Sequence, residues 1–361
     1  MRILQVCSAR EIGGGERHVI DLAKALARRG HEVFAALAPA SPVADKLIDI
    51  PQANVIQLPV RNSFNILTAA KLTRFVRDHR IEIVHAHIAR DYPLAALAAN
   101  RGGAQLVLTR HVLFPLNRIH RLTLRRVNRV IAVSQAVAES LRARHIFHDD
   151  QIVVIHNGID VDHFGLKASR AKPPEKLRIG MIGHLAPIKG QEDFIHAAAI
   201  VCAQRSDVDF TVAGEDKSRS GKKRRALESL ITELGLTQRV QLLGWVEDVA
   251  ELLSTLDVFV SPARSEPFGL AIVEAMAAGV PVIASISAGA CEIIDADSIG
   301  VLVPIADVPA LADAISSLLD DPARRESLAA NARQVVGERF SLQRMAEATE
   351  AIYRSALECK L

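Results

Sequence analysis

The chain has 361 residues, 49% of them apolar and only 4% aromatic, which suits two domains with aliphatic cores rather than one. The apolar run at the amino terminus ends at Arg10 and is too short for a signal peptide, and no stretch is long enough for a transmembrane helix. Its four cysteines form no Cys-x-x-Cys pair, so we expect reduced thiols in the cytoplasm rather than a zinc site or a disulfide framework, at Cys7, Cys202, Cys291 and Cys359.

The net charge of +3 is unevenly divided: residues 1–165 hold 22 basic against 14 acidic side chains, and the remainder holds 22 against 27. Basic residues gather between Arg110 and Arg144, as a solvated helix face or as a surface that attracts an anionic acceptor or anionic lipid headgroups. A second basic cluster at 217–225 is predicted to be a loop that leads into a helix. No aromatic residues are interleaved with these charges, so no nucleic-acid partner is expected. The first cluster also contains Arg118, Arg121, Arg125, Arg126, Arg129 and Arg142.

Apolar segments typical of strands alternate with amphipathic helices through the first half of the chain. Residues 2–7 predict a strand, and residues 15–29 predict a helix that ends at Gly30. The apolar face of this helix is formed by Val19, Leu22, Ala23 and Leu26. Further strands are predicted at 31–37, 54–58, 81–86, 105–109, 129–133 and 152–155. This rhythm indicates a parallel, doubly wound α/β sheet.

The same pattern restarts after a charged segment with two prolines at 165–178, which is predicted to be a linker. A new first strand is predicted at 177–183, followed by a helix from about Gln191. Later strands are predicted at 208–213, 239–243, 257–261, 280–284 and 300–303. We therefore expect domains at 1–165 and 166–340, and a final helix at 341–361 that packs back on the first domain. Ligands of such sheets bind at the carboxyl ends of the strands.

The segment SPARSEPFGLAIVEAMAAGVPVIAS at 261–285 has the most informative pattern. A buried strand is followed by a loop that carries Arg264 and Glu266, and then by a helix that starts near Gly269 and includes Glu274. The unpaired amide groups of such a helix start attract phosphate, and fixed carboxylates nearby suit sugar or ribose hydroxyls. An ordinary strand–loop–helix with one capping acid is the alternative.

The spacing of Glu266 and Glu274 within this segment resembles the signature of the GT4 retaining glycosyltransferases. Four other segments resemble that family in the expected order, so the resemblance covers nearly the whole chain. It implies a GT-B fold, with two Rossmann-like domains facing a central cleft. The four segments are GGGERHVIDLAKALARRGHEV, VIHNGIDVDHF (154–164), GHLAPIKGQEDFIHAA (183–198) and LGWVEDV (243–249).

The resemblance also implies a role for each matching residue of the second half. Glu274 would bind the donor ribose, and Glu266 would hold hydroxyls of the transferred sugar. Lys189 would pair with the donor diphosphate, where negative charge grows as the glycosidic bond breaks. The backbone of Phe268, Gly269 and Leu270 would receive sugar and phosphate oxygens.

His184 stands where the family usually has an arginine that clamps the diphosphate. Histidine is shorter and only partly charged at neutral pH. We therefore expect phosphate binding that is weaker, pH-dependent or supplemented by Arg264.

In the first half, Gly14 and Gly15 resemble the family's loop that closes over the donor phosphate. His111 follows a predicted strand at the position where the family often has a histidine near the reacting carbon, and we predict it to be catalytic together with Lys189 and Glu266. A structural histidine at a strand end is the alternative. His85 and His87 share one strand face, a spacing that suits a metal. No third ligand is evident, so a structural or acceptor-lining role is favoured.

The sequence thus predicts a retaining transferase that moves a hexose-type sugar from a UDP or GDP sugar to a glycan or lipid-linked acceptor, in cell-surface polysaccharide or lipopolysaccharide synthesis. Neither a cofactor nor a metal is expected, and the location is predicted to be cytoplasmic, with peripheral contact to an anionic membrane. The alternatives are a sugar-nucleotide epimerase of the same fold and a non-catalytic nucleotide-sugar-binding subunit. A nicotinamide dehydrogenase is disfavoured because no Gly-x-Gly-x-x-Gly follows either first strand.

Overall fold

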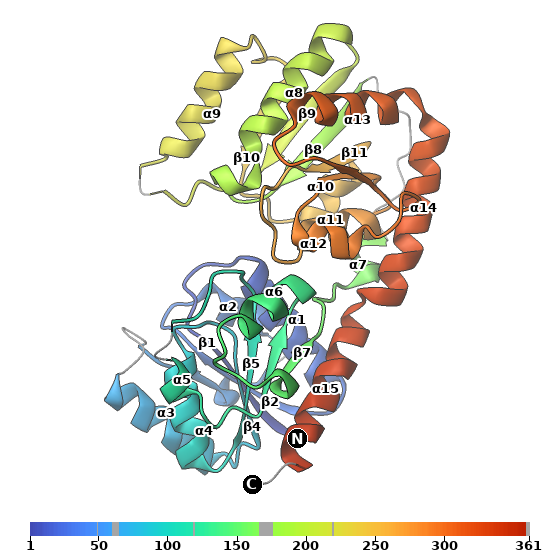
Figure 1. Cartoon of the computed structure of the whole chain (residues 1–361). Coiled ribbons are helices and arrows are strands. Elements are labelled where there is room, and N and C mark those ends of the chain that lie inside the picture. The colour runs from blue at the N-terminus through green and yellow to red at the C-terminus, as the bar shows by residue number, and fades with distance from the viewer. Residues whose placement is uncertain (49, 60–64, 118–119, 166–175, 219, 359–361) are drawn as a thin grey trace. The chain divides into compact units, whose positions relative to one another are not determined.

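The computed structural model describes residues 1–48, 50–59, 65–117, 120–165, 176–218 and 220–358. Two compact units are present: the first unit is Met1–Gly158 with Leu342–Leu361, and the second unit is Ile159–Ser341 (Figure 1). Most of the linker predicted at 165–178 lies outside the described residues, as do Arg118 and Cys359. Among the described residues, no helix combines the length and apolarity that crossing a bilayer requires.

The first unit contains a seven-stranded parallel sheet in the order β3-β2-β1-β4-β5-β6-β7. The order reverses between β1 and β4, which makes their carboxyl ends the switch point of the sheet. Each strand was predicted, within two residues at either end. They are β1 Arg2–Cys7, β2 Glu32–Leu37, β3 Val55–Gln57, β4 Ile83–Ala86, β5 Gln105–Arg110, β6 Arg129–Ala132 and β7 Ile152–Val154.

Helices cover this sheet, and the predicted apolar face of α1 is buried in the core. The amino-terminal ends of two helices have side-chain caps: Asn65 accepts a hydrogen bond from Thr68 N, and Ser134 accepts one from Val137 N. The elements are α1 Gly14–Arg28, α2 Pro42–Lys46, η1 Gln52–Asn54, α3 Ile66–Asp78, α4 Tyr92–Gly102, α5 His120–Thr123, α6 Gln135–Arg142, η2 Asp149–Gln151 and α15 Leu342–Glu358.

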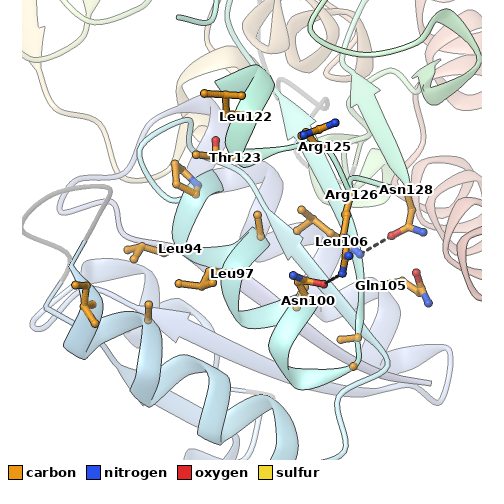
Figure 2. A pocket seen from close by; sticks show the side chains of 17 residues that line it. Leu94, Leu97, Asn100, Gln105, Leu106, Leu122, Thr123, Arg125, Arg126 and Asn128 are labelled. Atoms are coloured by element: carbon orange, nitrogen blue, oxygen red, sulfur yellow. Dashed lines mark hydrogen bonds between the residues drawn. The ribbon is translucent and has the colours of Figure 1, made fainter. Parts of the chain in front are cut away.

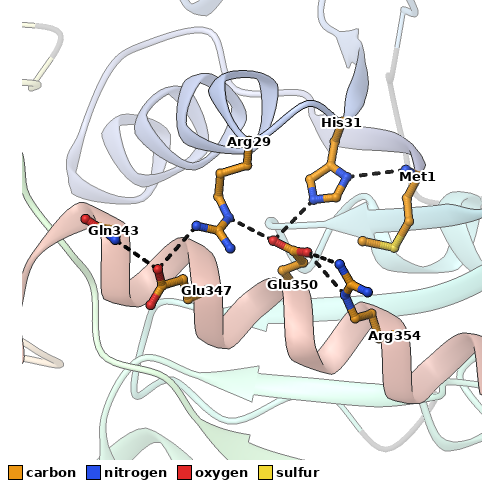
Figure 3. A network of polar contacts seen from close by, with 7 residues as sticks. All are labelled: Met1, Arg29, His31, Gln343, Glu347, Glu350 and Arg354. Atoms are coloured by element: carbon orange, nitrogen blue, oxygen red, sulfur yellow. Dashed lines mark hydrogen bonds and ion pairs between the residues drawn. The ribbon is translucent and has the colours of Figure 1, made fainter.

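Helix α15 comes from the end of the chain and packs against α1 in the first unit. Glu350 lies in the middle of the polar contacts that join them (Figure 3). Its Oε2 is 2.8 Å from Arg29 Nε and 3.3 Å from His31 Nε2. Arg354, one turn further along α15, binds the other carboxylate oxygen. On the buried side of α15, Tyr353 is fully buried against the sheet.

The second unit repeats the architecture with a six-stranded parallel sheet in the order β10-β9-β8-β11-β12-β13. Its order reverses between β8 and β11, so the loops after these two strands meet at the switch point. The strands are β8 Leu177–Ile182, β9 Val208–Ala213, β10 Val240–Gly244, β11 Val258–Ser261, β12 Val282–Ser285 and β13 Val301–Val303. The prediction of two doubly wound α/β domains is confirmed.

Aspartate caps set several helix starts in the second unit. Asp248, Asp307 and Asp321 each accept a hydrogen bond from the backbone amide three residues later. The core cluster beneath these helices is mainly aliphatic and includes an edge-to-face aromatic pair, Phe194 and Phe210. The elements are α7 Val161–Gly165, η3 Pro187–Lys189, α8 Gln191–Gln204, α9 Lys222–Glu233, α10 Val249–Ser254, α11 Leu270–Ala277, α12 Ala288–Ile293, α13 Val308–Asp320 and α14 Pro322–Arg339.

Candidate active site

A close ion pair joins the loops that follow β8 and β11 in the second unit. Lys189 Nζ lies 2.6 Å from Glu266 Oε2, and the two side chains are only 21% and 15% exposed. Lys189 ends η3, and Glu266 precedes α11, so the pair spans 77 positions of sequence. The structure therefore brings together two residues that the sequence predicts to act on the same donor molecule.

The same two loops are locked together by further contacts. Arg264 binds Asp193 of α8 with two nitrogens, at 3.0 and 3.2 Å, and its backbone amide donates to Ile188 O at 2.9 Å. Gly190 has φ +74°, and a Cβ there would lie 2.1 Å from Pro262 O. Only glycine permits this approach. The guanidinium of Arg264, predicted to bind the donor, is thus already paired with a carboxylate.

The turn into α11 is fixed by glycines and by a buried aromatic ring. Gly269 has φ +114°, and Gly289 N donates to Glu266 O at 3.0 Å. A Cβ on Gly289 would lie 2.2 Å from Phe268 O. The Phe268 ring is buried and meets Phe340 edge-to-face. This packing holds the amide groups of Leu270 and Ala271, which precede the first hydrogen bonds of α11, beside Glu266.

Glu274 lies in α11, four residues after Leu270, so the two side chains share one face of the helix. The residue is only 3% exposed. Burying a carboxylate is costly unless donors compensate it. Its burial one turn beyond the glycine turn is consistent with a fixed acceptor of hydrogen bonds, which is the role that the family resemblance implies.

His184 follows β8 at the edge of the same site. Its backbone oxygen accepts a hydrogen bond from Gln191 Nε2 at 3.0 Å. Partial burial lowers the pKa of the His184 ring, and the nearby cations Lys189, Lys217 and Lys223 lower it further. The ring is therefore mainly neutral at pH 7, in a positive surrounding that favours an anionic ligand.

In the first unit, three histidine rings meet at the carboxyl ends of the strands. His111 follows β5, His87 follows β4, and His18 comes from α1. The ring centroids of His111 are 4.7 Å from His18 and 5.8 Å from His87. A Cβ on Gly15 would make an ordinary contact with the His111 ring at 3.5 Å, so the predicted glycine loop and His111 are neighbours.

Burial lowers the pKa of all three rings, so they are held neutral. Asn157 lies beside His18 and partly offsets the lowering of the His18 pKa. No hydrogen bond of ordinary geometry joins the two side chains. Sequence reasoning missed His18, because it was assigned only to the helix that contains it.

His85 has a different environment from its neighbour on the strand. Its Nδ1 is 2.6 Å from the Tyr353 hydroxyl, and its Nε2 is 2.7 Å from Thr109 Oγ1. Both ring nitrogens are therefore satisfied inside the core, which assigns His85 a structural role. His87 has one such contact, between Nε2 and Gln5 Oε1 at 2.7 Å.

A buried carboxylate near the end of β1 also escaped sequence reasoning. Asp91, fully buried, accepts hydrogen bonds from Ser8 N at 2.8 Å and from the Ser8 hydroxyl. Arg90 donates to Ser8 O at 2.7 Å. Burial raises the pKa of Asp91, while the Ser8 hydrogen bonds oppose the rise. This network fixes the loop after β1; an isolated Arg-Asp pair in the sequence gives no signal for it.

A hollow of about 1160 Å³ lies between α3, α4 and α5 (Figure 2). Its lining is mainly apolar, with Arg125 and Arg126 at one side. Gln105 and Leu106, at the start of β5, also line it. It therefore lies at the opposite end of that strand from His111, away from the histidine cluster.

Two doubly wound parallel sheets, each with polar side chains on the loops at its switch point, define the GT-B class of fold. The family models "Glycosyltransferase Family 4" and "Glycosyl transferases group 1" match residues 12–163 and 164–335. The chain belongs to the GT4 family of glycosyltransferases. The resemblance found in five sequence segments is thereby confirmed.

The sequence of this chain is similar to those of other glycosyltransferases. An uncharacterized glycosyltransferase of Methanocaldococcus jannaschii is 32% identical over 242 residues, which cover 63% of this chain and 60% of that protein. The lipopolysaccharide core biosynthesis mannosyltransferase LpsB of Rhizobium meliloti is 28% identical over 246 residues, 66% of this chain and 68% of that protein. The match thus spans less than two thirds of the archaeal relative's own length.

Solved structures share the fold along nearly the whole chain. A glycosyltransferase from Rickettsia africae has a TM-score of 0.88 at 25% identity, with 99% of each chain covered. Anabaena HepE, solved in complex with UDP and glucose, has a TM-score of 0.85 at 25% identity, with 98% of this chain and 100% of that chain covered.

Proposed function

We propose that this protein is a retaining glycosyltransferase that moves a hexose-type sugar from a UDP or GDP sugar to a glycan or lipid-linked acceptor. The observation that carries the proposal is the Lys189–Glu266 pair, 2.6 Å apart and set against the glycine turn of α11. A sugar diphosphate offers a partner to each side chain: the phosphates suit the ammonium, and the sugar hydroxyls suit the carboxylate. The complex of HepE with UDP and glucose supports a donor of this type.

In the proposed reaction, the bond between the anomeric carbon and the diphosphate oxygen breaks while the acceptor hydroxyl attacks from the same face. The hydroxyl proton passes to the departing diphosphate oxygen, so charge and atoms balance without a further reactant. Lys189 and the first amide groups of α11 stabilise the charge that grows on the leaving group. His184 adds a hydrogen bond, and a positive charge when protonated. This chemistry requires neither a metal nor a cofactor.

His111, Gly14 and Gly15 are our proposed contacts to the donor on the first unit. The packing of Gly15 against the His111 ring supports treating them as one feature. Their roles are those that the family resemblance implies.

The acceptor side of the proposal draws on the surface of the first unit. Ile66, Leu67, Phe114 and Leu122 are each more than 70% exposed, and Arg121 and Arg125 are exposed on the same stretch of chain as Leu122. Apolar side chains beside arginines suit an anionic membrane surface. Together with the mannosyltransferase LpsB among the relatives, this supports a lipid-linked acceptor in polysaccharide or lipopolysaccharide synthesis, at the cytoplasmic face of a membrane.

Replacing Lys189 tests the proposal. We expect Lys189→Ala to lower transfer, or the slow donor hydrolysis that occurs without acceptor, by about 100-fold or more, as loss of one oxyanion donor does. Lys176→Ala is the matched control, because Lys176 pairs with Asp209 at 3.2 Å on the surface of the same unit. Unchanged turnover in Lys189→Ala would refute the diphosphate role. Donor binding without hydrolysis or transfer in the native protein would instead indicate a non-catalytic subunit.

A further inference from the structure

The three histidine rings that meet in the first unit could together bind a metal ion. His18, His87 and His111 each present a ring nitrogen, and these three nitrogens all lie within 4.8 Å of one another. They come from three separate elements: α1, the end of β4 and the end of β5. Their convergence is a property of the fold, and no sequence spacing encodes it.

The ring nitrogens are buried without partners. Both nitrogens of His18, both nitrogens of His111 and Nδ1 of His87 are inaccessible and make no hydrogen bond. A buried polar atom without a partner costs roughly 1–3 kcal/mol. Five such atoms on three neighbouring rings are unusual in a packed core, where nearly all buried polar groups are paired. A ligand that accepts one lone pair from each of the three imidazoles would remove this cost for three of the five atoms.

The spacing of the rings fits a tetrahedral metal. Zinc binds imidazole nitrogen at about 2.0–2.1 Å, which places the ring centroids of three ligands roughly 5 Å apart. The observed centroid separations are 4.7, 5.6 and 5.8 Å. Tetrahedral zinc places its ligand nitrogens roughly 3.3 Å apart, so a pair of nitrogens at the 4.8 Å limit would have to close by about 1.5 Å.

A second layer of contacts prepares one ligand. His87 Nε2 faces Gln5 Oε1 at 2.7 Å, and Gln5 Nε2 is in turn 3.3 Å from the Tyr353 hydroxyl. A carbonyl oxygen at this position requires a proton on Nε2, so the lone pair of His87 is on Nδ1. That is the atom without a partner in the cluster. Metal-binding histidines are oriented in this way by a hydrogen bond to the other ring nitrogen.

We propose that His18, His87 and His111 form a binding site for one late first-row divalent cation, with zinc as the best match. Three neutral imidazoles suit zinc, copper or nickel and not magnesium or calcium, which take oxygen ligands. The fourth position is left for water or a substrate atom. The transfer reaction proposed above needs no metal. If His111 contacts the donor sugar, which rests on the proposed function, bound zinc would inhibit transfer by occupying that ring.

Zinc binding by the full-length chain tests the site directly. The protein is dialysed against a chelator and then titrated with ZnCl₂ in competition with a chromophoric chelator. We expect one zinc ion per chain with a Kd below about 1 μM. His87→Gln and His18→Gln should each weaken binding by at least about 100-fold, since loss of a second-layer partner alone costs 10–100-fold.

Two control variants separate this site from adventitious binding. His85→Gln changes a buried histidine two residues before His87 whose two ring nitrogens already have partners. We expect this variant to keep full zinc affinity if circular dichroism shows that it is folded. His196→Gln removes an exposed histidine of α8 and should have no effect.

The native protein decides the question even if the ligand variants fail to fold. Cobalt added to the dialysed native chain should give the visible absorption of a tetrahedral centre, and zinc should abolish it. Absence of that absorption, absence of stoichiometric zinc, or wild-type affinity in a folded His87→Gln protein would each overturn the proposal. None of these measurements depends on transferase activity, so they test the zinc site even if the proposed transferase function is wrong.

Discussion

At the scale of single residues, the charged side chains of the candidate donor site form ion pairs with one another. Lys189 is held by Glu266, and Arg264 is held by Asp193. Pairing of this kind reduces the cost of keeping charges in a partly buried loop. A sugar diphosphate that binds must therefore replace these carboxylates as the partner of Lys189 and Arg264. A bound diphosphate also favours the protonated form of His184.

We predict that affinity for the donor diphosphate rises as the pH falls. The pKa of His184 is lowered in the free protein, so the ring is mainly neutral at pH 7, and a bound diphosphate would raise that pKa by favouring the charged form. Binding therefore takes up a proton between the two pKa values, and affinity increases by up to about tenfold per pH unit in that window. Calorimetric titrations from pH 5 to 8 measure this slope.

His184→Arg is the informative variant, because arginine stays charged throughout that range. Its diphosphate affinity should be higher than that of the native protein at pH 8 and should not change with pH. A slope that persists unchanged in His184→Arg would assign the effect to another group.

At the scale of elements, α15 completes the first unit from the far end of the sequence. Its contact with α1 concentrates on Glu350, whose side chain is only 9% exposed. Hydrogen bonds from Arg354 and Arg29, and a smaller effect of His31, lower the pKa of Glu350 from 4.5 to about 2. The carboxylate thus stabilises the folded state above pH 4.5, and this contribution is lost as the pH falls from 4.5 towards 2.

We expect Glu350→Gln to lower the free energy of unfolding at pH 7 by about 1–3 kcal/mol, which is the usual contribution of charged hydrogen bonds. Urea denaturation followed by circular dichroism measures the change. Glu347→Gln is the control: that side chain is 46% exposed and also contacts Arg29, so its loss should cost less than about 1 kcal/mol. Equal effects of the two substitutions would contradict the central place of Glu350.

Most of the elements were predictable, because a parallel strand buried on both faces is a short apolar run between turn residues. Few of the helices were given a position from the sequence, and the short helices α5, α10 and α12, which carry no comparable period, are among those that were not. Within the candidate site, Lys189 and Glu266 were predicted from the motifs that resemble the family. Their ion pair was not predictable, because it joins residues 77 positions apart in the sequence. The order of the strands in the sheet brings their two loops together. His18 was missed for the same reason, since its partners follow other strands.

At the scale of the whole molecule, we predict weak, salt-dependent binding to anionic vesicles through the exposed apolar and basic surface around α5. Arg125→Glu should weaken this binding by about fivefold or more, because each basic residue near an anionic surface contributes about 1 kcal/mol. Arg28→Glu, an equal charge change at the exposed end of α1, should have little effect. Vesicle cosedimentation at low and high salt distinguishes the two, and equal losses would show that only net charge matters.

The most direct test of the donor site is calorimetric titration of the native protein and of Lys189→Ala with UDP, GDP and their hexose conjugates. We predict that one of these nucleotides binds the native chain with one site per molecule, and that Lys189→Ala weakens its binding at least about tenfold, the effect of losing one charged contact of about 1.4 kcal/mol or more. A folded native protein that binds none of them, or a Lys189→Ala protein that binds as tightly as the native one, would contradict the assignment of a sugar diphosphate to the loops after β8 and β11.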